Sequence, residues 1–188
     1  KHIGQKNDFY FGELPNFLEK KKFKCVKIYR NLTDRSSLTI FKKNKSKLGN
    51  SLILSKSLSL FDEIRLCCKI INSFLLVSKL KYKDKNIKKF FSKNTFKFVG
   101  SSYNNLRLLR QVNLIAKKYT PKFFFLTLEG HAWEKLIINE LRKNFPKIKI
   151  LTYQFSIVTK YSRSLYLNLG RDYMPDLILT SGNFTKNE

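Results

Sequence analysis

Cysteine and acidic side chains are scarce in this chain of 188 residues. Its three cysteines, Cys25 and the adjacent pair Cys67 and Cys68, form neither a disulfide framework nor the spacing of a metal site, which fits a reducing compartment. Only 13 acidic residues stand against 38 lysines and arginines, so the formal net charge is +25. Such a charge normally indicates nucleic acid or an anionic membrane surface as a partner. Because the excess is mostly lysine and accompanies abundant asparagine, isoleucine and phenylalanine, drift of an AT-rich coding sequence explains it equally well.

Long apolar runs and targeting signals are also missing. Charged residues interrupt the helical pattern from about Leu58 to Leu80, so its apolar run falls short of the ~20 residues that a bilayer requires. The chain opens on Lys1 without a signal-peptide pattern and closes on a polar tail, and we expect both ends to be cuts in a longer protein. No repeat and no glycine-rich dinucleotide or phosphate loop is visible. A hydrophobic share of 43% excludes a disordered chain.

One stretch, Lys122 to Glu134, combines an apolar strand pattern with several polar residues. Its unbroken apolar run, Phe123 to Leu126, is typical of a strand buried on both faces of a parallel sheet. The run stops at Glu129 and Gly130, and a helical pattern follows. This order places Glu129 and His131 at the carboxyl end of a strand and at a helix N-terminus. Open α/β sheets bind ligands at that edge, and the unpaired N–H groups of a helix N-terminus attract anions.

The remaining pattern predicts an α/β domain with a parallel sheet. Apolar runs and apolar–polar alternation predict further strands at residues 24–29, 51–54, 147–153 and 176–180. Helical spacing predicts helices at residues 16–22, 58–80, 100–118 and 161–169, besides the one after Gly130. Residues 31–50 and 79–99 are expected to be loops or insertions. Because strands and helices alternate from Lys122 onward, we expect strands 122–128, 147–153 and 176–180 to be parallel neighbours.

The most basic stretch, residues 79–97, mixes lysines with aromatic residues. This mixture suits single-stranded nucleic acid, which would be bound by base stacking and phosphate contacts. It suits an anionic membrane surface as well. A solvated linker whose aromatic side chains fold back onto the core is a third interpretation, and composition leaves all three open.

The motifs of the second half form a recognisable set. Residues Glu129 to Glu134 read E-G-H-A-W-E, Pro175 to Gly182 read P-D-L-I-L-T-S-G, and shorter matches lie at residues 106–111 and at Tyr153-Gln154. The set resembles bacterial glycosyltransferases of surface-carbohydrate biosynthesis, including Kdo-transferase-like proteins of capsule and lipopolysaccharide assembly. The family's E-G-H-A-W-E box is matched in full. In the first half, only the turn from Phe11 to Pro15 and the helix after it look similar.

The resemblance implies a GT-B glycosyltransferase, in which two Rossmann-like domains face a cleft. Residues 1–188 would be its N-terminal, acceptor-side domain, a parallel sheet with flanking helices. The enzyme would move a sugar from a nucleotide-sugar donor, with CMP-linked sugars among the candidates, to a growing surface polysaccharide or lipid-linked acceptor. It would work in the cytoplasm, on the inner face of the membrane, without metal or cofactor. The C-terminal domain would hold most of the donor, so residues 1–188 alone are not expected to transfer sugar.

Within the E-G-H-A-W-E turn, Glu129 is the candidate catalytic residue. Its carboxylate would bind an acceptor hydroxyl or take its proton, although it could instead cap the following helix. His131 would bind sugar or phosphate or bridge to Glu134, and Glu134 itself also suits the helix dipole. Trp133 is either a core anchor or a platform for sugar stacking. Gly130 shapes the turn and is included among the substrate-binding candidates.

At the next strand end, Gln154 is a further candidate for substrate binding. Relatives commonly carry a histidine after the Tyr-Gln pair, whereas Phe155 follows here, so a contact made by that histidine is lost or supplied elsewhere. Two other classes of function stay open. One is a basic nucleic-acid-binding module centred on residues 79–97. The other is a non-catalytic α/β interaction domain whose E-G-H-A-W-E turn only caps a helix.

Overall fold

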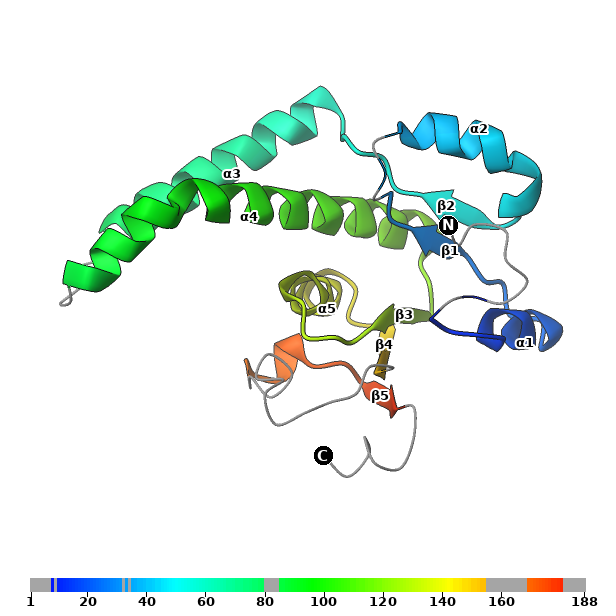
Figure 1. Ribbon diagram of the computed structural model, residues 1–188. Coiled ribbons are helices and arrows are strands. Elements are labelled where there is room, and N and C mark those ends of the chain that lie inside the picture. The colour runs from blue at the N-terminus through cyan, green and yellow to red at the C-terminus, as the bar shows by residue number, and fades with distance from the viewer. Residues whose placement is uncertain are drawn as a thin grey trace.

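The computed structural model describes residues 8, 10–31, 33, 35–79, 85–154 and 169–180, with side chains for all of these except residues 46–48, 74, 76–79 and 85–99. They form a mixed α/β structure with two small parallel sheets (Figure 1). In chain order the elements are α1 (Leu14–Lys20), β1 (Lys27–Tyr29), α2 (Ser37–Leu48), β2 (Ser51–Ile53), α3 (Leu60–Lys79), α4 (Lys85–Tyr119), β3 (Phe123–Thr127), α5 (Ala132–Asn144), β4 (Lys149–Gln154), the 3-10 turn η1 (Arg171–Tyr173) and β5 (Leu177–Thr180).

The three strands expected to be parallel neighbours form one sheet in the order β3-β4-β5. Phe123 lies opposite Lys149, and Gln154 lies opposite Thr180, with both pairings parallel. The prediction for this sheet is therefore confirmed. Because all three strands are parallel, their carboxyl ends lie at one edge of the sheet. The helix predicted at residues 161–169 lies outside the described residues, except for Leu169.

β1 and β2 form a second parallel sheet, connected by α2. The prediction of a loop over residues 31–50 is wrong for residues 37–48, which form α2. The Ser36 side chain accepts a hydrogen bond from the backbone N–H of Thr39 and so begins the helix. Leu38 and Phe41 are exposed on α2. No apolar residue lies between Phe41 and Leu48, so the sequence of this helix has little apolar periodicity.

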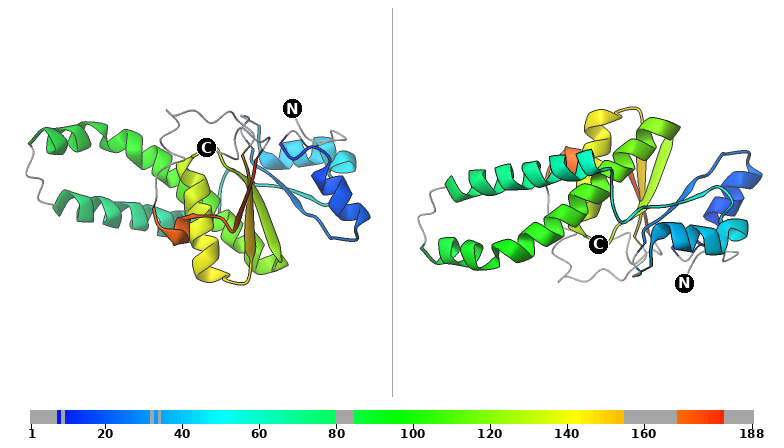
Figure 2. Two further views of the ribbon diagram at one scale, coloured as in Figure 1. Left: turned by 90° about the horizontal axis from the view of Figure 1, so that it is seen from below. Right: turned by 90° about the horizontal axis from the view of Figure 1, so that it is seen from above.

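α3 and α4 form a long antiparallel hairpin that extends beyond the sheets (Figure 2). α3 confirms the helix expected from about Leu58 to Leu80. α4 begins at Lys85, well before the expected start at Gly100, so the loop prediction for residues 79–99 is wrong from Lys85 onward. Gly100 lies inside this helix, because one glycine costs a helix only about 1 kcal/mol relative to alanine. Within the described residues, no helix is both long and apolar enough to cross a membrane.

One hydrophobic core joins the two sheets. Its buried members are Leu54, Leu108, Val112, Ala116, Leu126, Ile137, Ile138, Leu141, Ile148 and Ile150. The segment after β2 contributes Leu54, whereas α4 contributes Leu108, Val112 and Ala116. The remaining members come from β3, α5, β4 and the residue before β4. The C-terminal half of α4 thus connects the β1-β2 sheet to the β3-β4-β5 sheet.

Candidate active site

The E-G-H-A-W-E turn lies at the carboxyl end of β3 and leads directly into α5. Leu128 continues the strand by donating its N–H to the carbonyl of Tyr153, and the chain then turns at Glu129 and Gly130. Gly130 has φ of 84°, in the left-handed region that glycine adopts without the steric cost of a side chain. The chain can therefore reverse direction within three residues and start α5 at Ala132.

The Glu134 carboxylate holds this turn from inside. It is completely buried and accepts hydrogen bonds from the backbone N–H groups of Glu129, Gly130 and His131, at 2.9–3.1 Å. The Thr127 hydroxyl adds a fourth donor, at 3.2 Å. Burial raises the pKa of Glu134, while the N–H groups of Glu129 and His131 oppose that rise. With its oxygens engaged by four donors of the chain, Glu134 positions the turn rather than presenting a surface to a ligand.

The Glu129 carboxylate, in contrast, is partly exposed and pairs with His131. The Nε2 atom of His131 lies 3.1 Å from an oxygen of Glu129, and the two side chains keep 55% and 30% of their surface exposed. The His131 ring also stacks on the Trp133 ring, with centroids 6.2 Å apart and planes 20° apart. His131 is the N-cap residue of α5 and forms a capping box with Glu134, so Glu129 does not cap the helix. The carboxylate expected to be catalytic stays accessible beside an imidazole.

The other two predicted residues contribute differently. Trp133 is partly buried and packs against the hydrophobic core, so its ring is a core anchor that also supports His131. Gln154 ends β4 and is only 4% exposed. Its amide lies within the carboxyl edge of the sheet rather than on the surface. All six predicted residues therefore lie at or next to the carboxyl ends of β3 and β4, but only Glu129 and His131 combine polar side-chain atoms with substantial exposure.

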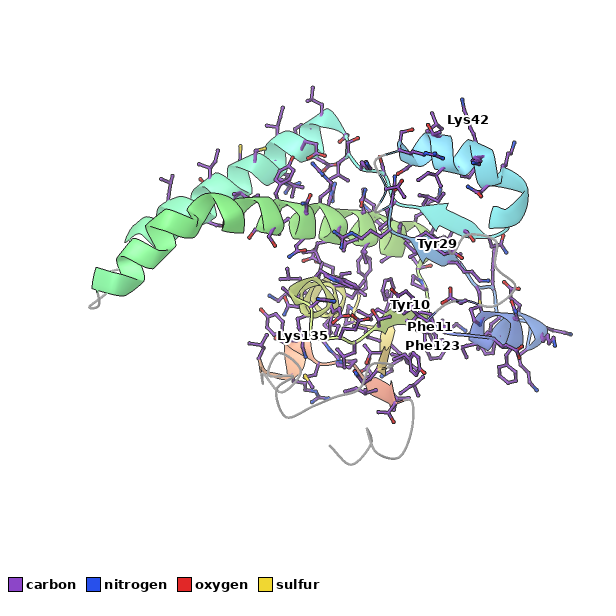
Figure 3. All side chains as sticks on the ribbon, in the orientation of Figure 1. Tyr10, Phe11, Tyr29, Lys42, Phe123 and Lys135 are labelled. Atoms are coloured by element: carbon purple, nitrogen blue, oxygen red, sulfur yellow. The ribbon has the colours of Figure 1, made fainter. Side chains whose placement is uncertain are left out.

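A cavity of about 350 Å³ lies at the same edge, and sequence reasoning missed it. Its walls are formed by Tyr10, Phe11, Gly12, Leu14, Tyr153 and Leu179. The rings of Phe11 and Tyr153 are 6.2 Å apart and tilted by 43°. Tyr153 lies opposite Thr127 in the sheet, and Thr127 precedes Glu129 by two residues in the chain. Figure 3 shows Tyr10 and Phe11 beside β3 and β4.

A polar turn near the N-terminus builds the opposite wall of this cavity. The Asp8 carboxylate accepts hydrogen bonds from the N–H groups of Tyr10 and Phe11, and Asp8 and Gly12 exchange two backbone hydrogen bonds. Gly12, with φ of 54°, permits the reversal. The only sequence signal for this cavity was the resemblance of the Phe11–Pro15 turn to the glycosyltransferase family. That resemblance did not indicate that the turn contacts Tyr153. Among the described residues, no three His, Cys, Asp or Glu side chains gather as a metal site would require.

Comparison of the chain with protein-family models, curated proteins and solved structures gives no match. The resemblance to surface-carbohydrate glycosyltransferases therefore rests on the motifs themselves. What the structure adds is the arrangement of those motifs, with an accessible carboxylate–imidazole pair and an aromatic cavity at one sheet edge.

Proposed function

We propose that this chain is the acceptor-side, Rossmann-like domain of a GT-B glycosyltransferase. The enzyme transfers a sugar from a nucleotide-sugar donor to a surface polysaccharide or lipid-linked acceptor. The observation that carries the proposal is the exposed Glu129–His131 pair at the carboxyl edge of a parallel sheet. Ligands of open α/β sheets bind at that edge. A second domain of the same protein supplies most of the donor contacts.

In this proposal Glu129 acts as general base. The acceptor hydroxyl gives its proton to the Glu129 carboxylate while its oxygen forms the bond to the anomeric carbon, and the nucleotide leaves with the electrons of the broken bond. His131, 3.1 Å away, orients the carboxylate and binds a neighbouring sugar hydroxyl. Glu134 fixes the backbone that carries both residues. The aromatic cavity beside Tyr153 receives an acceptor sugar, since sugar rings pack their C–H faces on aromatic rings.

We further propose that the protein works on an anionic membrane surface, and α3 supports this. Asp62 and Glu63 of α3 pair with Arg110 and Arg107 of α4, so a partly polar face of α3 packs inside the hairpin. An apolar stripe is left exposed, consisting of Leu60, Phe61, Ile64, Ile71 and Leu75. An exposed apolar stripe on a strongly cationic protein suits the interface of anionic lipids.

The test is Glu129→Gln in the full-length enzyme. Glutamine keeps the size of the side chain but removes its charge and basicity, so turnover should fall at least ~100-fold. The melting temperature should stay close to that of the wild type, because Glu134 rather than Glu129 holds the turn. A matched control is Glu19→Gln, which removes an exposed carboxylate from α1 and should leave turnover unchanged. A stable Glu129→Gln enzyme with full activity would exclude the catalytic role.

A further inference from the structure

A second cavity, of about 410 Å³, lies at the carboxyl ends of β1 and β2. Arg30 follows β1 directly, and Lys56 lies three residues beyond the end of β2. The third wall is the face of α4 that carries Arg107. The cavity therefore occupies, on the smaller sheet, the kind of edge at which parallel sheets bind ligands.

The walls of this cavity are cationic. Three basic side chains, Arg30, Lys56 and Arg107, line it together with neutral residues, and none of its lining residues is acidic. Arg107 is held in place by Glu63, at 2.9 Å, and its guanidinium lies 4.6 Å from the centre of the Tyr103 ring. Neither Arg30 nor Lys56 forms an ion pair with a described residue. Two positive charges thus face one cavity without a carboxylate of the described chain to neutralise them.

Amide side chains complete the polar lining. Asn31, Asn104 and Gln111 all border the cavity. Gln111 donates to the carbonyl of Ser55 at 2.7 Å, which ties α4 to the segment after β2. Asn31 donates to the carbonyl of Arg35 at 2.9 Å and to the Ser37 hydroxyl at 3.1 Å, which fixes the segment after β1. The backbone that carries Arg30 and Lys56 is therefore anchored on both sides, as a preformed site requires.

We propose that this cavity binds a phosphate monoester carried by the substrate. A phosphate monoester bears between one and two negative charges near neutral pH, which matches the two charges of Arg30 and Lys56. Its oxygens accept several hydrogen bonds, and the Arg30 guanidinium, the Lys56 ammonium and the Asn104 amide supply donors at the cavity wall. Assignment of the phosphate to the sugar acceptor rests on the proposed glycosyltransferase function. Binding of phosphate itself does not.

The experiment measures binding of inorganic phosphate to the intact protein by calorimetry, against chloride at equal ionic strength. Phosphate should bind saturably, and Arg30→Gln and Lys56→Gln should each weaken it about tenfold, the usual effect of losing one charge-assisted hydrogen bond. The matched controls are Arg65→Gln on α3 and Lys42→Gln on α2, which remove one exposed charge each outside this cavity. They should change binding less than twofold.

Equal weakening by all four variants would overturn the proposal, because it would show attraction by net charge alone. So would phosphate binding no tighter than chloride. Melting temperatures of the variants establish that each is folded, and both target side chains are exposed enough for substitution to be tolerated. Because this readout requires no turnover, it can fail while Glu129→Gln still abolishes activity, and the reverse also holds.

Vesicles distinguish the two sources of the phosphate group. Phosphatidic acid carries a phosphate monoester, whereas phosphatidylglycerol carries a diester, so vesicles of the two lipids can be compared at equal surface charge. A preference for phosphatidic acid that Arg30→Gln removes would support the site and assign it to a lipid-borne phosphate. Phosphate binding in solution without that preference would support the site and assign it to a soluble substrate.

Discussion

Two carboxylates in one turn have different tasks because their surroundings differ. Glu134 is buried and accepts hydrogen bonds from three backbone N–H groups and one hydroxyl. Glu129 is partly exposed, and its carboxylate lies 3.1 Å from the His131 imidazole. A sequence places both acids near a helix N-terminus, where either suits the dipole. Which of them turns inward depends on the backbone reversal at Gly130, and sequence reasoning therefore could not assign the cap.

The first prediction is that Glu134→Gln destabilises the protein. Glutamine places an NH₂ group where the N–H groups of the turn require an acceptor, so a buried donor loses its partner. The expected cost is about 2 kcal/mol of unfolding free energy, or roughly 4–8 °C in melting temperature for a domain of this size. Urea or thermal unfolding measures it. Glu129→Gln serves as the control in the same turn, and equal melting temperatures for the two variants would contradict the assigned roles.

Asp176, in the closing P-D-L-I-L-T motif, has a structural task of its own. Its carboxylate accepts the N–H of Ile150 at 2.7 Å, and its own N–H donates to the Ile150 carbonyl at 2.8 Å. The Arg142 guanidinium of α5 lies 3.3 Å from the same carboxylate. The hydrogen bond from Ile150, together with the charge of Arg142, lowers the pKa of Asp176. The motif thus connects β5 to β4 and α5.

The second prediction follows from that lowered pKa. A carboxylate whose folded pKa is depressed stabilises the protein fully above its unfolded pKa of ~3.9 and loses this contribution as pH falls through the folded value. The stability difference between wild type and Asp176→Asn should therefore be largest above pH ~4 and shrink toward pH ~2. Urea midpoints measured across this range test it. The control Asp172→Asn alters an exposed carboxylate of η1, and a constant difference for Asp176→Asn would contradict the prediction.

At the scale of elements, predictability depended on how continuous the apolar pattern is in the sequence. The strands of the β3-β4-β5 sheet were recognisable because apolar residues run through them. Leu126 and Ile150 are buried, whereas Phe123 is 47% exposed, so the expected burial of residues 123–126 on both faces is wrong for Phe123. α2 was missed because polar residues and lysines occupy residues 42–47, which leaves no continuous apolar stripe in its sequence. The sequence predicted α3 as a helix, but it did not predict which face of α3 packs against α4. That choice depends on Arg107 and Arg110, more than 40 residues away in the chain.

The third prediction concerns the exposed stripe of α3. Ile64 and Ile71 are 54% and 57% exposed, so Ile64→Ser with Ile71→Ser should hardly change the melting temperature. If the stripe enters the membrane interface, the double variant should bind anionic vesicles at least tenfold more weakly, since each isoleucine forfeits on the order of 1 kcal/mol of apolar burial. Sedimentation with vesicles measures this. Leu38→Ser is the control, because Leu38 is 63% exposed but lies on α2. Unchanged sedimentation of the double variant would contradict the membrane assignment.

At the scale of the whole molecule, sequence patterns indicated the α/β class but not how the two sheets share a core. The βαβ alternation after Lys122 fixed which strands are parallel, because crossover connections allow few alternatives. No sequence pattern of this kind indicated how β1 and β2 are connected to the β3-β4-β5 sheet. Their connection runs through α4, whose buried face meets Leu54 and Ile138 in one cluster. Contacts between segments so far apart in the chain leave no periodic signal.

The last prediction follows from that shared core, and it is that the two sheets unfold together. Trp133, the only tryptophan, lies on α5, whereas the far-ultraviolet circular dichroism signal is dominated by the long helices α3 and α4. The two probes should therefore give coincident unfolding curves, as expected of a single cooperative unit.

Val112→Ala on α4 tests the coupling of the two sheets further. Val112 is only 4% exposed, and its truncation should cost about 2 kcal/mol. Both probes should shift by the same amount, because Val112 packs in the cluster that joins the sheets. A shift seen by circular dichroism but not by tryptophan fluorescence would instead divide the molecule into two independently folding parts, with α4 belonging to the β1-β2 sheet alone.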